Sequence, residues 1–242
     1  MENYGFLRVA AGVPTVRVAD VAYNVGEILK LAEKAESEEV SLIAFPELSV
    51  TGYTCGDLFG QEILIRKAEE GIKEIKAFSR GRKVTIVVGV PVRVRGRLYN
   101  CAAVIQNGSL RGLVPKIHLP SYNEFYETRW FASGADFIIR DRRSDGLLRD
   151  DGKNCHFESG AESILYAGHK VTISPNILFS LSHSTFAIEI CEDLWSPIPP
   201  SNNLALAGAD VILNLSASDE RIGKHDYLRQ LISQQSARTI SA

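Results

Sequence analysis

The chain has 242 residues, of which 45% are hydrophobic and 23% charged, the balance of an ordinary globular protein with a sizeable core. Its composition shows no break that would divide it, so we expect one α/β domain. A formal net charge of -2 gives no electrostatic reason to expect nucleic acid or a membrane surface as a partner. No apolar run approaches the roughly 20 residues of a membrane span.

The first part of the chain alternates strands with amphipathic helices. We expect strands at residues 6–11, 40–45 and 84–90, separated by helices at 21–39 and 61–78. Such alternation favours parallel strands that are covered by helices.

The pattern then changes to a meander of antiparallel strands. Residues 92–94 and 98–106 lead to Asn107-Gly108, which is a strong hairpin signal, and a strand over 109–114 follows. The change predicts a sheet that is parallel at one side and antiparallel at the other.

A long stretch from residue 121 to about 169 has no periodicity. We interpret its aromatic front half as a pocket wall and its charged run at 140–153 as a solvated excursion. Residues 170–173 and 177–179 are then expected to form an antiparallel pair that leads into the strand before Cys191.

The last part of the chain contains a short helix over 202–209, a buried strand over 210–215 and a polar-faced helix from 223 to about 239. This helical pattern reaches the end of the sequence without a C-cap glycine. We therefore expect a domain, spanning 1–242, that is incomplete at its C-terminal end.

The cysteines stand far apart and form no C-x-x-C pair. This spacing predicts neither a zinc site nor a disulfide framework, so we expect no metal and a reducing, cytoplasmic compartment. The four are Cys55, Cys101, Cys155 and Cys191.

Cys191 ends the β-branched run at 185–190, and the acidic pair Glu192-Asp193 follows it. A corner between strand and turn points a thiol out of the sheet edge and leaves the next backbone N–H groups unpaired, as a nucleophile with an oxyanion hole requires. The alternative is a small buried hydrophobe, because free cysteine is among the most buried residue types.

Two further strand ends carry a charge. Glu47 follows the strand at 40–45, where a carboxylate costs free energy unless it is partnered or working, and its alternative role is a turn cap. Lys116 stands between a strand end and a proline-bounded loop, and its alternative is a solvated surface lysine. Strand ends gather at one crevice in open α/β sheets, so we expect Glu47, Lys116 and Cys191 to meet.

Together these three groups form a set that can cleave an amide. The thiolate is the nucleophile, the neighbouring cation is expected to lower the thiol pKa, and the carboxylate can take and return protons.

Three segments of the sequence, in matching order and spacing, resemble the nitrilase (carbon-nitrogen hydrolase) superfamily. They are most similar to the amino-terminal glutaminase domain of glutamine-dependent NAD synthetases, and the resemblance covers nearly the whole chain. The segments are 45–48 with 51–53, then 115–127, then 189–195, joined by 214–218.

The resemblance implies an α-β-β-α sandwich and a role for each residue of the set. Glu47 is implied to be the general base, Lys116 to stabilise the tetrahedral oxyanion, and Cys191 to attack the side-chain amide of glutamine. Ammonia then leaves, and water activated by Glu47 hydrolyses the thioester. Glu127 matches a second glutamate near the lysine and is assigned a positioning role.

The resemblance also implies which residues bind the substrate. Glutamine is a zwitterion, so its pocket should supply an anion for the ammonium and a cation or hydroxyls for the carboxylate. By charge, Glu192 fits the first demand, and Lys224 with Ser218 fits the second. Close relatives often have arginine where Lys224 stands, and lysine lacks the bidentate fork. The full set is Tyr53, Tyr122, Phe125, Glu192, Ser218 and Lys224.

The full enzymes of this family continue into an ATP-dependent synthetase domain that aminates deamido-NAD. The sequence contains neither a Ser-Gly-Gly loop for ATP nor a glycine-rich phosphate cradle. We therefore expect the glutaminase half alone, without a cofactor of its own. ATP and Mg belong to the synthetase domain, its expected partner, and the family usually assembles as a homo-oligomer.

Two other functions stay open at this point. One is a stand-alone nitrilase-family amidase that acts on another small amide or carbamoyl compound. The other is a catalytically silent module that docks another subunit, although such a module has no need of Glu47, Lys116 and Cys191 together. Charged residues at Glu192 and Lys224 argue against an apolar nitrile as the substrate.

Overall fold

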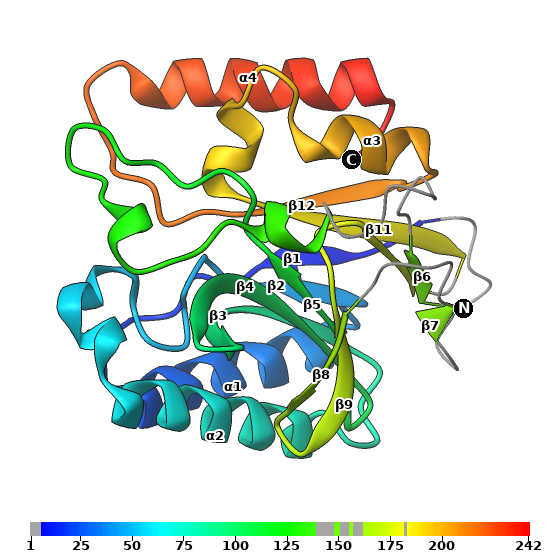
Figure 1. Ribbon diagram of the computed structural model, residues 1–242. Coiled ribbons are helices and arrows are strands. Elements are labelled where there is room, and N and C mark those ends of the chain that lie inside the picture. The colour runs from blue at the N-terminus through cyan, green and yellow to red at the C-terminus, as the bar shows by residue number, and fades with distance from the viewer. Residues whose placement is uncertain (1–5, 139–147, 151–154, 157–161, 182) are drawn as a thin grey trace.

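Two β-sheets lie face to face between two layers of helices in the computed structural model, which describes residues 6–138, 148–150, 155–156, 162–181 and 183–242 (Figure 1). The larger sheet has seven strands in the spatial order β1 (Val9–Ala11), β2 (Leu42–Ala44), β3 (Thr85–Val94), β4 (Arg97–Gln106), β5 (Ser109–Pro115), β9 (His169–Ile173) and β8 (Glu162–Tyr166). The smaller sheet has five, in the order β12 (Val211–Leu215), β11 (Ser184–Ile190), β10 (Ile177–Leu181), β6 (Leu148–Asp150) and β7 (Cys155–His156).

Helices cover the outer face of each sheet (Figure 1). The helices α1 (Val21–Ser37) and α2 (Glu62–Phe78) lie on the larger sheet, and α3 (Pro200–Leu206) and α4 (Lys224–Thr239) lie on the smaller one. The resulting four layers confirm the α-β-β-α sandwich.

The strand pairing follows the two sequence patterns. The strands β1, β2 and β3 pair in parallel, with α1 and α2 as the connections, as the alternation predicts. The strands β3, β4 and β5 then form an antiparallel meander. Its second turn contains Asn107 at φ 44° and Gly108 at φ 76°, the left-handed backbone that this dipeptide favours. β5 consequently runs parallel to β2, so both strands end at the same edge of the sheet.

The interface between the two sheets is a separate apolar layer. The larger sheet contributes Leu42, Val87 and Val104, and the smaller sheet contributes Phe179 and Phe186, whose rings stack with centroids 5.2 Å apart. This layer fixes the position of one sheet relative to the other. Any site that combines residues of both sheets therefore depends on it.

The expected antiparallel pair of residues 170–173 and 177–179 is wrong. The first segment lies in β9 of the larger sheet, where it pairs with β8 and β5, and the second lies in β10 of the smaller sheet, where it pairs with β11. The short link between them crosses from one sheet to the other. Two runs with a brief connection resemble a hairpin in sequence, and β8, the antiparallel partner of β9, lies in the stretch without periodicity.

The charged run at 140–153 falls mostly outside the described residues. Its described part, Leu148–Asp150, forms β6 and pairs in parallel with β10.

The last helix has the predicted bounds, but the expectation that its helical pattern reaches the end of the sequence is wrong. α4 ends at Thr239, and Ile240 takes the left-handed conformation at φ 52° that a C-cap glycine usually provides. The backbone of Ala242 then pairs with Asp210 and Ile212 beside β12. A β-branched residue rarely adopts the left-handed conformation, so a helix end at Ile240 is not expected from the sequence. Among the described residues, no helix combines the length and apolar character needed to cross a bilayer.

Gly89 in β3 allows the turn after β2 to lie directly on the strand. A Cβ on this residue would come within 2.1 Å of Leu48 N and 2.6 Å of Pro46 O. Two hydrogen bonds hold the turn there, because Val50 N donates to Gly89 O at 3.1 Å and Gly89 N donates to Ser49 Oγ at 3.3 Å. The close approach requires glycine at this position.

We expect Gly89→Ala to lower the thermal unfolding midpoint by several degrees. Overpacking costs about 1–3 kcal/mol, and each kcal/mol shifts the midpoint of a chain of this size by about 2–4 °C. Gly26→Ala in α1 is the matched control, because a Cβ there meets nothing within 4 Å and alanine favours a helix by about 1 kcal/mol. Equal midpoints for the two variants would contradict the close packing of this turn on Gly89.

Candidate active site

Charged residues from two strand ends of the larger sheet meet in the protein interior. Glu47 lies in the turn after β2, and Lys116 directly follows β5. Lys116 Nζ lies 2.7 Å from Glu47 Oε1 and 2.7 Å from Glu127 Oε1. The exposed fractions of Lys116, Glu47 and Glu127 are 0%, 2% and 1%. The lysine is therefore a fully buried ammonium held between two carboxylates.

Further hydrogen bonds fix the orientation of both carboxylates. Asn100 Nδ2 in β4 donates to Glu47 Oε1 at 2.7 Å, and Ala217 N donates to Glu47 Oε2 at 3.2 Å. Tyr53 OH donates to Glu127 Oε1 at 2.8 Å. Since Ala217 follows β12, Glu47 connects the ends of strands from both sheets.

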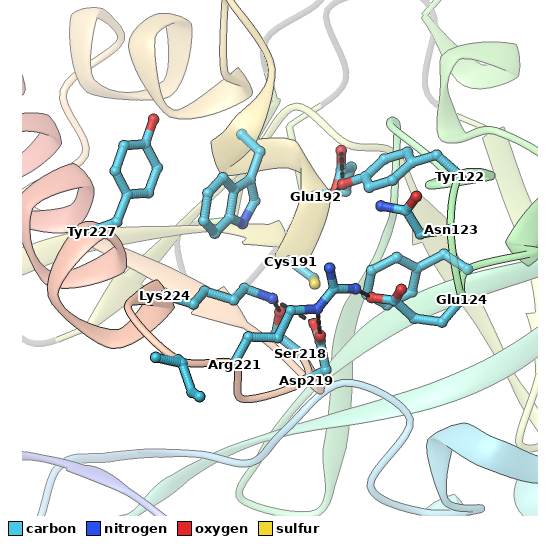
Figure 2. A pocket seen from close by; sticks show the side chains of 13 residues that line it. Tyr122, Asn123, Glu124, Cys191, Glu192, Ser218, Asp219, Arg221, Lys224 and Tyr227 are labelled. Carbon is cyan, nitrogen blue, oxygen red and sulfur yellow. Dashed lines mark hydrogen bonds and ion pairs between the residues drawn. The ribbon is translucent and has the colours of Figure 1, made fainter.

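Cys191 lies at the corner where β11 ends and the 3-10 helix η4 (Cys191–Trp195) begins. Its φ of 48° is left-handed, a conformation that costs a residue with a Cβ about 1–2 kcal/mol and tends to persist at functional positions. The residue is only 5% exposed, yet it lines a pocket of about 340 Å³ (Figure 2). The thiol is thus accessible from that pocket.

Lys116 does lower the pKa of the Cys191 thiol, as expected, but the net shift is upward. Burial raises the pKa of Cys191 above its ordinary value, the charges of Glu47 and Glu127 raise it further, and the opposing effect of Lys116 is too small to reverse them. At neutral pH Cys191 is therefore a protonated thiol that needs a base, and Glu47 is the carboxylate that affects its pKa most.

The ammonium of Lys116 stays protonated although it is buried. Burial alone lowers the pKa of this lysine, but the surrounding acidic groups, Glu47 foremost, outweigh burial and raise it above its ordinary value. The adjacent acid responds in the other way, because burial, then the charge of Glu47, raises the pKa of Glu127 from 4.5 to about 7. Lys116 therefore stays positively charged at neutral pH, and the carboxyl group of Glu127 beside it titrates near neutral pH.

The pocket above Cys191 has an acidic and an aromatic side. Tyr122 OH donates to both carboxylate oxygens of Glu192, at 3.0 and 2.8 Å. The ring of Phe125 meets that of Tyr122 edge-on, with centroids 5.7 Å apart. Both rings belong to the aromatic front half of the irregular stretch, where the sequence predicts a pocket wall.

The other side of the pocket contains two cations, Lys224 and Arg221, each paired with a carboxylate (Figure 2). Lys224 Nζ donates to Ser218 Oγ at 2.8 Å and to Asp219 Oδ1 at 2.5 Å. The guanidinium of Arg221 pairs with Asp219 and also with Glu124, which comes from the opposite loop. Sequence reasoning missed Asp219, Arg221 and Glu124. The charged run after Ser218 was a signal that could have found the first two.

The structure brings the ten predicted site residues together in two groups. Glu47, Lys116, Glu127 and Tyr53 form the buried cluster. The residues that line the pocket are Cys191, Tyr122, Phe125, Glu192, Ser218 and Lys224. Tyr53 belongs to the first group because its hydroxyl contacts Glu127. Among the described residues, no group of three or more His, Cys, Asp or Glu is arranged to hold a metal ion.

Asp193 is a further residue that sequence reasoning missed. Its Oδ1 accepts hydrogen bonds from Ile117 N at 3.2 Å and His118 N at 2.8 Å, and its Oδ2 accepts one from Ile190 N at 2.9 Å. The side chain therefore ties the turn of Cys191 to the segment that follows Lys116. Its position in the acidic pair after Cys191 was the available signal.

We expect the stability of the protein to fall as the pH rises from about 4.5 to about 7. In this window folded Glu127 still holds a proton that the unfolded chain has released, which is worth on the order of 3 kcal/mol. Denaturant titrations at several pH values should show a shallower slope for Glu127→Gln. The exposed Glu70→Gln is the control, and an unchanged slope in Glu127→Gln would contradict the buried titration.

Asp193→Asn should lower the free energy of unfolding by about 1–3 kcal/mol, because an amide oxygen cannot replace both carboxylate oxygens and a backbone N–H is left unpaired. The rate at which iodoacetamide alkylates Cys191 should change as well, since the turn that contains Cys191 loses hydrogen bonds to the segment after Lys116. Asp57→Asn is the matched control, because Asp57 lies in an exposed pair with Arg129. Alkylation at the wild-type rate would show that Asp193 does not position the thiol.

Comparison with known proteins agrees with this geometry. The sequence matches the carbon-nitrogen hydrolase family over residues 8–242. The glutamine-dependent NAD(+) synthetase of Mycobacterium bovis is 36% identical over 243 residues, which are 99% of this chain and 32% of that protein. The corresponding protein of Aquifex aeolicus is 31% identical over 210 residues, which are 87% of this chain and 30% of that protein. The chain therefore spans about a third of the length of these relatives.

Solved structures show the same fold. A glutamine-dependent NAD(+) synthetase from Cytophaga hutchinsonii has a TM-score of 0.78 at 27% identity, with 97% of this chain and 34% of that chain covered. An amidase from Nesterenkonia sp. has a TM-score of 0.68 at 16% identity, with 97% of this chain and 73% of that chain covered, a likeness of fold alone. The family match, which extends over nearly every residue, shows that this chain belongs to the carbon-nitrogen hydrolase family.

Proposed function

We propose that this domain hydrolyses the side-chain amide of glutamine through a thioester on Cys191. The released ammonia would serve a synthetase domain that converts deamido-NAD to NAD with ATP. One observation carries the proposal: the buried ammonium of Lys116, held by Glu47 and Glu127, lies beside a thiol on the wall of a pocket with charges of both signs. Relatives that are glutamine-dependent NAD(+) synthetases support it.

Acylation begins with a proton transfer, because the raised pKa keeps Cys191 protonated. Glu47 accepts the thiol proton while Sγ attacks the amide carbon. Lys116 has three N–H donors, of which Glu47 and Glu127 engage two, and the third stabilises the oxyanion that forms. Glu47 then returns the proton to the leaving nitrogen, the C–N bond breaks, and ammonia leaves a thioester on Cys191.

Deacylation uses the same groups in the same order. Water loses a proton to Glu47 as its oxygen attacks the thioester carbon, and Lys116 again stabilises the oxyanion. The C–S bond breaks, the thiol recovers its proton from Glu47, and glutamate leaves. Glu127 and Tyr53 keep Lys116 in place throughout.

The charges of the pocket suit a free amino acid. Glu192 would receive the α-ammonium, and Lys224 with Ser218 would receive the α-carboxylate. Tyr122 and Phe125 would cover the aliphatic part of the side chain. A neutral amide without these charges would form no ion pair with Glu192 or Lys224.

The wider setting is part of the proposal. ATP and Mg would bind in the synthetase domain and not in this one, and the enzyme would act in the cytoplasm as a homo-oligomer.

The second candidate is a stand-alone amidase for another small amide, which the fold of the Nesterenkonia amidase favours because this chain covers 73% of it.

Ammonia release from glutamine is the test. We expect Cys191→Ala to abolish it, and Glu47→Gln and Lys116→Met to reduce kcat by at least about 100-fold, the usual effect of losing a general base or an oxyanion donor. Cys101→Ala is the control, because this thiol lies in the core behind β4 and should leave the rate unchanged.

The substrate range decides between the candidates. Glutamine should be hydrolysed faster than asparagine and far faster than acetamide or butyramide. A preference for the simple amides would favour the stand-alone amidase. No release of ammonia from any of these substrates would contradict catalysis by this site.

A further inference from the structure

A chain of ion pairs crosses the pocket that contains Cys191. Lys224 Nζ bonds to Asp219 Oδ1, Arg221 Nε bonds to Asp219 Oδ2, and Arg221 Nη2 bonds to Glu124 Oε1. All four residues line the pocket, and Figure 2 shows the guanidinium of Arg221 extending to Glu124 on the other loop. The chain therefore links the loop after β12 to the aromatic wall.

Two cations, Lys224 and Arg221, pair with the single carboxylate of Asp219. Asp219 balances one of the two charges and leaves one positive charge at this end of the pocket. That charge is met by Glu124, a carboxylate from the opposite loop. A substrate that carries its own carboxylate offers the same group to the same guanidinium.

We propose that Arg221 binds the α-carboxylate of the substrate together with Lys224, and that Glu124 occupies this position until the substrate arrives. The proposal rests on the function proposed above and adds a residue that determines specificity. Glu124 is then an internal stand-in for the carboxylate of glutamine, and binding exchanges one carboxylate for another on Arg221.

Lysine and arginine bind a carboxylate in different ways, and this difference supports the role of Arg221. A lysine ammonium binds a carboxylate as a point charge, whereas a guanidinium has five N–H donors in a fork that fits both carboxylate oxygens. Only two of the five are engaged by Asp219 and Glu124. Arg221 thus supplies the bidentate geometry that a lysine at position 224 lacks.

The exchange is easy because the ion pair at the pocket mouth is exposed. The side chains of Arg221 and Glu124 are 49% and 41% exposed, whereas those of Asp219 and Lys224 are 29% and 20% exposed. Exposed ion pairs contribute little to stability, so Glu124 can be displaced while Asp219 keeps its cations in place.

Two substrates isolate the effect of the carboxylate. Glutamine has both the α-ammonium and the α-carboxylate, and 4-aminobutanamide has the same ammonium and amide but no carboxylate. We expect Arg221→Ala to raise the KM for glutamine roughly tenfold to 100-fold, as the loss of a charged hydrogen bond does, with kcat nearly unchanged. Its kinetics with 4-aminobutanamide should equal those of the wild type.

Glu124→Gln tests the stand-in directly. Removing the competing carboxylate should lower the KM for glutamine in the wild-type background and have no effect in the Arg221→Ala background. Arg129→Ala is the matched control, because Arg129 is also an exposed arginine paired with a carboxylate, Asp57, but lies away from this pocket. It should leave both substrates unaffected.

The outcomes separate this inference from the proposed function. If the wild type hydrolyses glutamine but Arg221→Ala affects both substrates equally or neither, the role of Arg221 is overturned and the glutaminase activity stands. A rise in KM in Glu124→Gln would overturn the stand-in, because the ion pair would then be needed for substrate binding. A wild type that prefers 4-aminobutanamide would overturn both.

Discussion

The buried ammonium of Lys116 is the constraint on which the site depends. A charge that is fully removed from water is tolerated only when it is paired and hydrogen-bonded, and here Glu47 and Glu127 supply both. Those carboxylates in turn need Asn100, Ala217 and Tyr53. The loss of any one partner would leave a charged or polar group uncompensated in the interior, so the cluster behaves as a unit.

This arrangement also determines how the thiol can react. Burial and two nearby carboxylates raise the pKa of Cys191, so under the proposed mechanism the thiol is activated by proton transfer to Glu47 at the moment of attack. That differs from sites in which a cation stabilises a resting thiolate. A neutral thiol is also a poorer target for oxidants and alkylating agents between turnovers, since thiolate is the reactive species.

Sequence reasoning succeeded where local pattern and strand ends carry the information. Periodicity predicted the helices and the parallel start of the larger sheet, and abrupt strand ends predicted that Glu47, Lys116 and Cys191 would meet. It failed where tertiary context decides. The segments in β9 and β10 look like a hairpin although they belong to different sheets, Ile240 ends a helix in a conformation unusual for its side chain, and the polar contacts of Asp193 and Arg221 depend on loops that are remote in sequence.

The apolar layer between the two sheets has a consequence for how this protein is studied. The larger sheet carries Glu47 and Lys116, the smaller sheet carries Cys191, and the packing around Phe179 and Phe186 aligns them together with the hydrogen bonds of Ala217 and Asp193. Neither half of the sandwich could retain chemistry on its own. Catalytic turnover should therefore fall as soon as the two sheets shift relative to one another. This loss would come well before spectroscopic signals of secondary structure disappear.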